Sequence, residues 1–418
     1  MKIFYGWRMV FAGGAIQFLQ NGLLHQAFGA YFAVLIEEKG WSKTALSGAA
    51  ALQPVEAAVL GPVLGWIVDR FGPQGMIRTG IITFGIGFML LSQIDTLAGF
   101  YGAFITIALG SSLCGFFPLQ VAIIYWFEKR RARALSLLSL GAALGGIFVL
   151  AVAWSIQSFG WRATAFASGV LVILVGFPLA RVFRGRPEDH GETIDGLPPA
   201  ATEVADTEAS TQREFSTREA LGTSAFWLIS LGHSFALLIV YAVLVHAITH
   251  MKETLGYSVS EGSLVITLLT ITQVVGIMLG WLIGDRVEKR LLAAFSMLMH
   301  ACGLLLLTYA TGPVMLGAFV ILHGVAWGLR GPLMQAMRAD YFGRRSIGMI
   351  MGLSSVIIVT GQIGGPMIAA VLADWTGNYR AGFTLLAGMA GLGSLFFLLA
   401  KHPRHKRARP SPMLEVAD

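Results

Sequence analysis

The chain has 418 residues, of which 55% are hydrophobic and only 13% are charged, and its formal net charge is +7. Soluble globular domains carry about 25% charged residues, so this composition excludes a soluble protein and indicates an integral membrane protein. The excess of positive charge does not indicate a nucleic-acid partner, because the basic residues gather in alternate loops between apolar segments. The two cysteines, Cys114 and Cys302, lie inside apolar segments and imply no disulfide framework.

Apolar segments of about 20 residues recur along the chain, each long enough to cross a hydrocarbon layer of about 30 Å. Six predicted helices make the first half, at 7–35, 46–68, 76–92, 98–127, 134–158 and 162–182. Six more make the second half, at 225–250, 262–284, 291–309, 313–341, 347–372 and 381–400. We therefore predict an N-terminal bundle at 1–183, a linker at 184–223, a C-terminal bundle at 224–400 and a disordered basic tail at 401–418.

The predicted linker is too long and too hydrophilic to cross the bilayer. Near its end, Ser216 and Glu219 have the spacing of a capping box, which predicts a short surface helix before the seventh crossing.

Basic residues are distributed unequally between the two sides of the predicted membrane. With the N-terminus in the cytoplasm, that side receives the clusters at 129–133 and 401–409 together with most other Lys and Arg. The opposite side receives only Lys39, Lys43, Arg162, Lys252 and Arg380. The positive-inside rule then predicts that both termini are cytoplasmic. We expect a multi-pass protein of a bacterial-type inner membrane.

Short motifs repeat between the two halves. Gly40-Trp41-Ser42 and Asp69-Arg70 recur 216 residues later as Gly256-Tyr257-Ser258 and Asp285-Arg286. Each pair occupies the same end of the corresponding predicted helix. The halves are therefore predicted to be parallel repeats of six helices, related by an axis along the membrane normal.

Two segments carry a resemblance to a known family. Gly65-Trp-Ile-Val-Asp69-Arg70-Phe-Gly72 resembles the signature loop of the major facilitator transporters. The segment from Trp126 to Arg131, before the fifth helix, resembles the monocarboxylate transporter group, which includes oxalate/formate-type exchangers. The resemblance implies an all-α integral membrane fold of twelve transmembrane helices in two six-helix pseudo-symmetric bundles, with the substrate site between the halves at the midplane. We expect a monomer.

The repeated loop doublets are candidates for a latch. Asp69 and Arg70, and their counterparts Asp285 and Arg286, lie at helix ends. There they can bond neighbouring helix termini and hold the cytoplasmic side shut. A simple turn with a surface ion pair is the alternative.

The segment LHGVAWGLRGPLMQAMRADY, at 322–341, carries Arg330 near the middle of a predicted membrane helix. An arginine there costs at least a few kcal/mol, so it normally faces a bundle interior or an aqueous cavity. His323 and Trp327 share its helical face, which predicts an anion site. The alternative is that Arg330 pairs with a buried acid and locks two helices together.

The resemblance implies an essential arginine in the eighth helix, which holds the substrate carboxylate. This chain departs there, because 267–280 reads TLLTITQVVGIMLG and contains no basic residue. Arg330 is the expected substitute.

The resemblance also implies that the first, fourth, seventh and tenth helices line the cavity. Their mid-membrane candidates are Gln17 and Asn21 on the first helix, Phe117 on the fourth, and His233 and Tyr241 on the seventh. Asn21 or Gln17 could donate to a carboxylate, and Tyr241 could give a hydroxyl. Bonding to a neighbouring helix and ordinary aromatic packing are the alternatives.

Two groups are candidates for a coupling proton or a gate. Glu56 lies near the middle of the second helix, where a carboxyl can carry a proton or pair with a base across the cavity. His233, on the seventh helix, is the other candidate. A static salt bridge is the alternative for Glu56. His246 and His250 are one turn apart, but no carboxylate or cysteine lies at ligand spacing, so no metal site is expected.

These features favour a secondary transporter that moves a small organic anion, most simply a monocarboxylate, by alternating access, with proton coupling or by exchange. The chain contains no Walker-type loop and nothing that resembles a catalytic triad, so neither ATP-driven transport nor an enzyme is expected, and no cofactor is expected. Two alternatives stay open: an exporter of lipophilic compounds, with Arg330 tied to Glu56, and a membrane sensor that binds a ligand without moving it.

Overall fold

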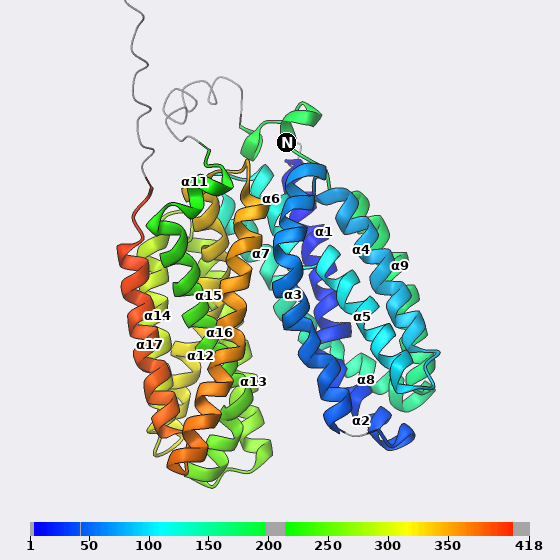
Figure 1. The fold of residues 1–418 in the computed structure, drawn as a ribbon, viewed down its shortest axis with the longest axis vertical. Coiled ribbons are helices and arrows are strands. Elements are labelled where there is room, and N and C mark those ends of the chain that lie inside the picture. The colour runs from blue at the N-terminus through cyan, green and yellow to red at the C-terminus, as the bar shows by residue number, and fades with distance from the viewer. Residues whose placement is uncertain (1–3, 42, 198–213, 404–418) are drawn as a thin grey trace, which may run out of the picture.

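The computed structural model of the chain describes residues 4–41, 43–197 and 214–403, and these residues form helices, turns and loops without strands. Figure 1 shows two helical bundles side by side, with the linker and the described chain ends at one end of the molecule, which we call the linker end. The fold predicted from the sequence, twelve transmembrane helices in two six-helix bundles, is confirmed. Most of the predicted basic tail, 404–418, and the linker residues 198–213 lie outside the described residues.

The N-terminal bundle contains six crossings. They are formed by α1 (Tyr5–Gln20), η1 (Asn21–Gln26) and α2 (Phe28–Lys39); α3 (Lys43–Phe71); α4 (Pro73–Leu91); α5 (Leu97–Cys114) and α6 (Phe116–Trp126); α7 (Arg131–Leu144), η2 (Gly145–Ile147) and α8 (Phe148–Phe159); and α9 (Trp161–Arg181). The linker carries η3 (Pro187–His190), η4 (Ile194–Gly196) and α11 (Thr217–Leu221).

The C-terminal bundle contains α12 (Ser224–Leu255), α13 (Val259–Ile283), α14 (Lys289–Thr308), α15 (Pro313–Phe342), α16 (Ile347–Thr376) and α17 (Arg380–Leu399). Among the described residues, nine helices are long and apolar enough to cross a membrane by length and composition. The first, second and fifth crossings complete the twelve.

Three crossings of the N-terminal bundle are interrupted near their middles, where the sequence predicts continuous helices. The first contains the π-helical turn η1, the fourth breaks at Gly115, whose backbone is extended, and the fifth contains the 3-10 turn η2. The Gln20 side chain donates to the Ser111 carbonyl oxygen (2.9 Å), which replaces a backbone bond lost at the break. Extended backbone at membrane depth, as at Gly115, is tolerated only inside the protein or along a cavity, and π-helical turns are frequent at functional sites, so these interruptions mark the functional region.

Gly145 shows why two of these breaks meet. A Cβ at this position would lie 2.8 Å from the Phe18 carbonyl oxygen and 2.8 Å from the Asn21 Cβ. Only glycine therefore permits η2 to lie against η1.

The linker returns to the N-terminal bundle. Asp195, with a φ of 58°, accepts hydrogen bonds from the backbone N–H groups of Glu128 (3.1 Å) and Lys129 (2.7 Å), just before α7. Further along, the predicted capping box is confirmed, because Ser216 and Glu219 bond each other's backbone N–H groups at the start of α11.

The two bundles meet closely at the linker end through α3 and α16. A Cβ on Gly65 would lie 2.4 Å from the Gly348 carbonyl oxygen, and one on Gly352 would lie 2.3 Å from the Gly61 carbonyl oxygen. Small residues at these positions bring the two backbones into direct contact. The structure is therefore closed at the linker end.

Candidate functional site

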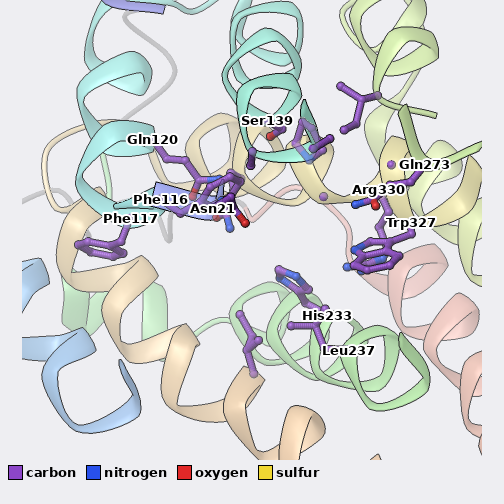
Figure 2. Close-up of a pocket in the computed structure, with 18 of the residues that line it drawn as sticks. Asn21, Phe116, Phe117, Gln120, Ser139, His233, Leu237, Gln273, Trp327 and Arg330 are labelled. Atoms are coloured by element: carbon purple, nitrogen blue, oxygen red, sulfur yellow. The ribbon is translucent and has the colours of Figure 1, made fainter. Parts of the chain in front are cut away.

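A cavity of about 680 Å³ lies between the bundles. The N-terminal bundle contributes Asn21, Phe116, Phe117, Gln120 and Ser139, and the C-terminal bundle contributes His233, Leu237, Gln273, Trp327, Arg330, Gln335 and Arg338. Figure 2 shows side chains of both bundles directed toward one common space. The three interrupted crossings supply the N-terminal wall, so the breaks position the cavity.

Arg330 is the central cation of this cavity. It lies on α15, is only 1% exposed, and its Nε and Nη1 atoms have no hydrogen-bond partner among the described residues. The close approach of α15 to α13 fixes its position: a Cβ on Gly328 would lie 1.9 Å from the Gln273 carbonyl oxygen. A buried guanidinium without a carboxylate leaves a positive charge that an anion would neutralise.

Arg338 is a second buried cation, which the sequence analysis did not select. It is 2% exposed and donates from Nη1 to Gln335 Oε1 (3.0 Å) and from Nη2 to His233 Nδ1 (3.0 Å). Arginine only donates hydrogen bonds, so His233 accepts at Nδ1 and, as a neutral ring, carries its proton on Nε2. The positive charges of both Arg330 and Arg338 act on His233. The sequence indicated this second cation only by placing Arg338 in the same apolar segment as Arg330.

The rest of the polar lining consists of neutral groups. Gln120 is 1% exposed, and its Nε2 atom has no partner among the described residues. Gln335 uses its amide oxygen for Arg338, which leaves its NH₂ group free to donate. Among the described residues that line the cavity, none is acidic. The cavity thus combines N–H donors with two uncompensated cations, which is the chemistry of an anion site.

Of the predicted binding residues, the cavity brings together Arg330, Asn21, Trp327 and Phe117, and also His233. Figure 2 shows these side chains around the same space. Asn21 donates to the Gln17 carbonyl oxygen (3.3 Å), so its amide oxygen is free to face the cavity.

Four other predicted residues lie outside the cavity lining. Gln17 is 1% exposed and Tyr241 is half-buried within α12. His323 is fully buried, with its Nδ1 atom 3.2 Å from Nδ1 of His300 on α14. Glu56 accepts from the Ser112 hydroxyl (3.1 Å) on α5. Glu56 therefore faces a neighbour within its own bundle and not Arg330.

The two repeated aspartates connect the bundles at the linker end. Asp69 accepts from the backbone N–H groups of Gly348 (2.9 Å) and Met349 (2.8 Å), at the N-terminus of α16. Asp285 accepts from those of Ala132 (2.8 Å) and Arg133 (3.1 Å), at the N-terminus of α7. Each aspartate thus binds the positive end of a helix in the opposite bundle.

The arginines of the same doublets lie elsewhere. Arg70 stacks over the Trp66 ring at 5.6 Å, and Arg286 is exposed. Asp285 lies in the loop after α13, where burial raises the pKa of its carboxyl against the opposing effect of the N–H groups of Arg133 and Ala132.

Further contacts reinforce the closed linker end. Asp340, at the end of α15, pairs with Arg131 of α7 and with Lys289 (2.9 Å). Arg344 donates to the Tyr125 carbonyl oxygen (2.6 Å) and pairs with Glu188 of the linker (2.9 Å). These partners are far apart in the sequence, which contains no pattern that would pair them.

Two pseudo-symmetric bundles of six helices, with a cavity between them that contains buried cations, define a membrane transporter. Residues 10–249 and 229–416 match the family described as Major Facilitator Superfamily, and the chain belongs to that family. It is a secondary transporter of multi-pass membrane type, and not an enzyme.

The chain is 24% identical over 404 residues to monocarboxylate transporter 13 of Bos taurus, in a match that covers 94% of this chain and 89% of the relative. It is 23% identical over 411 residues to the glycerol-3-phosphate transporter of Bacillus subtilis (strain 168), with coverages of 93% and 91%. Among solved structures, the proton:xylose symporter XylE superimposes with a TM-score of 0.75 at 14% identity, over 94% of this chain and 95% of that chain. This last similarity concerns the fold alone.

Proposed function

We propose that this transporter carries a small organic anion whose carboxylate binds Arg330. The observation that supports the proposal is a nearly fully buried guanidinium that lines the central cavity with two unpartnered nitrogen atoms. A carboxylate fits the fork of an arginine with two parallel hydrogen bonds, and it removes the cost of the isolated charge. Two of the relatives are named as transporters of anions, namely a monocarboxylate and glycerol 3-phosphate. A monocarboxylate is the simplest substrate with this chemistry.

The proposed cycle alternates access to the cavity between the two membrane sides. The structure is closed at the linker end, where Asp69 and Asp285 bond helix termini of the opposite bundle. We assign this end to the cytoplasm of an inner membrane, because the Lys and Arg clusters gather there. Substrate binding shifts the balance between the two closures only by its difference in affinity for them.

His233 is the proposed coupling group. Its neutral ring accepts from Arg338, so a proton on Nδ1 would remove that bond and add a third positive charge beside two arginines. A bound anion in the same cavity makes this added charge less costly, which favours protonation of His233 in the loaded state. Anion and proton then travel together. Anion exchange without a proton is the alternative, and a pH gradient distinguishes the two modes.

The exporter of lipophilic compounds has less support. That alternative needs Arg330 to be tied to Glu56, whereas Glu56 bonds Ser112 within its own bundle. A sensor would use the same cavity for binding, and it differs from a transporter only in failing to move the ligand.

The test is uptake of a radiolabelled monocarboxylate into liposomes that contain the purified chain, with and without a proton gradient directed into the liposome. We expect saturable uptake by the wild type and none by Arg330→Gln. Arg218→Gln is the matched control, because Arg218 is exposed on α11. A carboxylate at a hundred times its dissociation constant should also stabilise the wild type by about 2.7 kcal/mol, but not Arg330→Gln.

Carboxylate uptake that survives in Arg330→Gln would refute the proposal. Stabilisation by a carboxylate without any uptake would favour the sensor.

A further inference from the structure

We propose that the cavity binds an organic dianion with two separate acidic groups, one held by Arg330 and the other by Arg338. This inference rests on the proposed function and narrows its substrate class. It starts from the presence of two arginines, each at most 2% exposed, in the lining of one cavity.

The first step concerns charge. Two acidic side chains that could have compensated these arginines bond elsewhere: Asp340, on the same helix, pairs with Arg131 and Lys289, and Glu56 bonds Ser112. Within the described lining, the partners of Arg338 are the neutral groups of His233 and Gln335. A single carboxylate on Arg330 would therefore leave one buried positive charge uncompensated, which is costly in a low-dielectric site.

The second step concerns distance. Arg330 and Arg338 are eight residues apart on α15, which corresponds to about 12 Å along the helix axis. Their side chains therefore leave the helix at different depths of the cavity. A molecule with an acidic group at each end matches two cations at different depths, because one group can bind the free Nε and Nη1 atoms of Arg330 and the other the free Nε atom of Arg338.

The third step concerns available donors. Arg330 has free Nε and Nη1 atoms, and Arg338 has a free Nε atom, among the residues that the structure describes. His233 can donate from Nε2, because its Nδ1 atom accepts from Arg338. The cavity volume of about 680 Å³ lies within the range of about 300–1,000 Å³ that small-molecule sites occupy. The site is therefore large enough for a short dicarboxylate.

The test measures equilibrium binding of succinate and butyrate to the full purified chain at neutral pH. The two compounds have chains of the same length and differ in the number of carboxylates. We expect succinate to bind the wild type about tenfold or more tightly than butyrate, as one additional charge-assisted hydrogen bond provides. Arg338→Gln should remove this preference by weakening succinate alone, and Arg338→Lys should restore part of it.

Arg218→Gln, on the surface, should change neither affinity. The ratio of the two affinities separates a binding role from a structural one, because a misfolded variant would lose both ligands together. The comparison on the wild type needs no variant at all.

Equal binding of succinate and butyrate would overturn the dianion inference and leave the anion transporter intact. A preference for glycerol 3-phosphate over succinate would also overturn it, since one doubly charged group would then suffice. Failure of every anion to bind would instead refute the proposed function itself.

Discussion

Replacing Asp69 by alanine is expected to destabilise the closed linker end. The carboxylate accepts two backbone hydrogen bonds, of 2.9 and 2.8 Å, across the bundle interface. Hydrogen bonds to charged groups contribute about 1.5–3 kcal/mol each. Because both bonds share one half-buried carboxylate, we take the lower value for each, which gives about 3 kcal/mol in total. A shift of this size corresponds to about a 150-fold change in the ratio of closed to open molecules.

The assay places a cysteine behind the closure. Met351, on α16, lines the cavity near the linker end, and Met351→Cys is combined with Cys114→Ala and Cys302→Ala. A membrane-impermeant maleimide is then added to the linker side of oriented vesicles. Asp69→Ala should accelerate labelling toward the 150-fold limit, and Asp285→Ala should act similarly through its own two bonds.

The control is Asp95→Ala, because Asp95 pairs with Lys39 and Arg162 in a loop far from the linker end. Its labelling rate should equal that of the parent. If Asp69→Ala also labels at the parental rate, the aspartate does not hold the two bundles together and the reasoning fails.

Two further predictions concern stability. Gln20→Leu removes the bond to the Ser111 carbonyl oxygen at the break between α5 and α6, so thermal unfolding should show a loss of about 1–3 kcal/mol; an unchanged unfolding temperature would contradict the role given to this bond. Hydrogen bonds from Lys39 and Arg162 lower the pKa of the exposed Asp95 carboxyl. A carboxyl with a lowered pKa stabilises the fold at pH values above the ordinary pKa of about 3.9. This contribution is lost as the pH falls through the pKa of the folded state. The stability difference between wild type and Asp95→Asn should therefore stay constant from about pH 5 to 8 and shrink below about pH 4; a difference that changes near neutral pH would show that another group is responsible.

The sequence by itself determined the membrane architecture. Segment length and hydropathy are local properties, so the twelve crossings and the polar linker follow from the composition of each segment. The recurrence of Asp69-Arg70 as Asp285-Arg286 relates the two halves to each other through residue identity and spacing alone. Arg330 was also identifiable, because a cation inside an apolar segment is costly and therefore conspicuous.

Only the tertiary structure decided which face of each helix meets the cavity. In a membrane bundle, lipid-facing and protein-facing surfaces are both apolar, so periodicity does not fix the rotation of a helix about its axis. That rotation depends on close backbone contacts such as the one between Gly328 and Gln273. For this reason His323 packs against His300 outside the cavity, although it shares a predicted face with Arg330.

The helix interruptions and the second cavity cation could also be identified only from the tertiary structure. The break at Gly115 is bridged by Gln20, a side chain from another crossing, and η2 lies against η1 because position 145 is a glycine. Arg338 lies near the end of its apolar segment, where a cation in the sequence is unremarkable. Its contact with His233, which comes from a helix more than a hundred residues away, exists only after the bundle has packed, and that contact makes Arg338 part of the site.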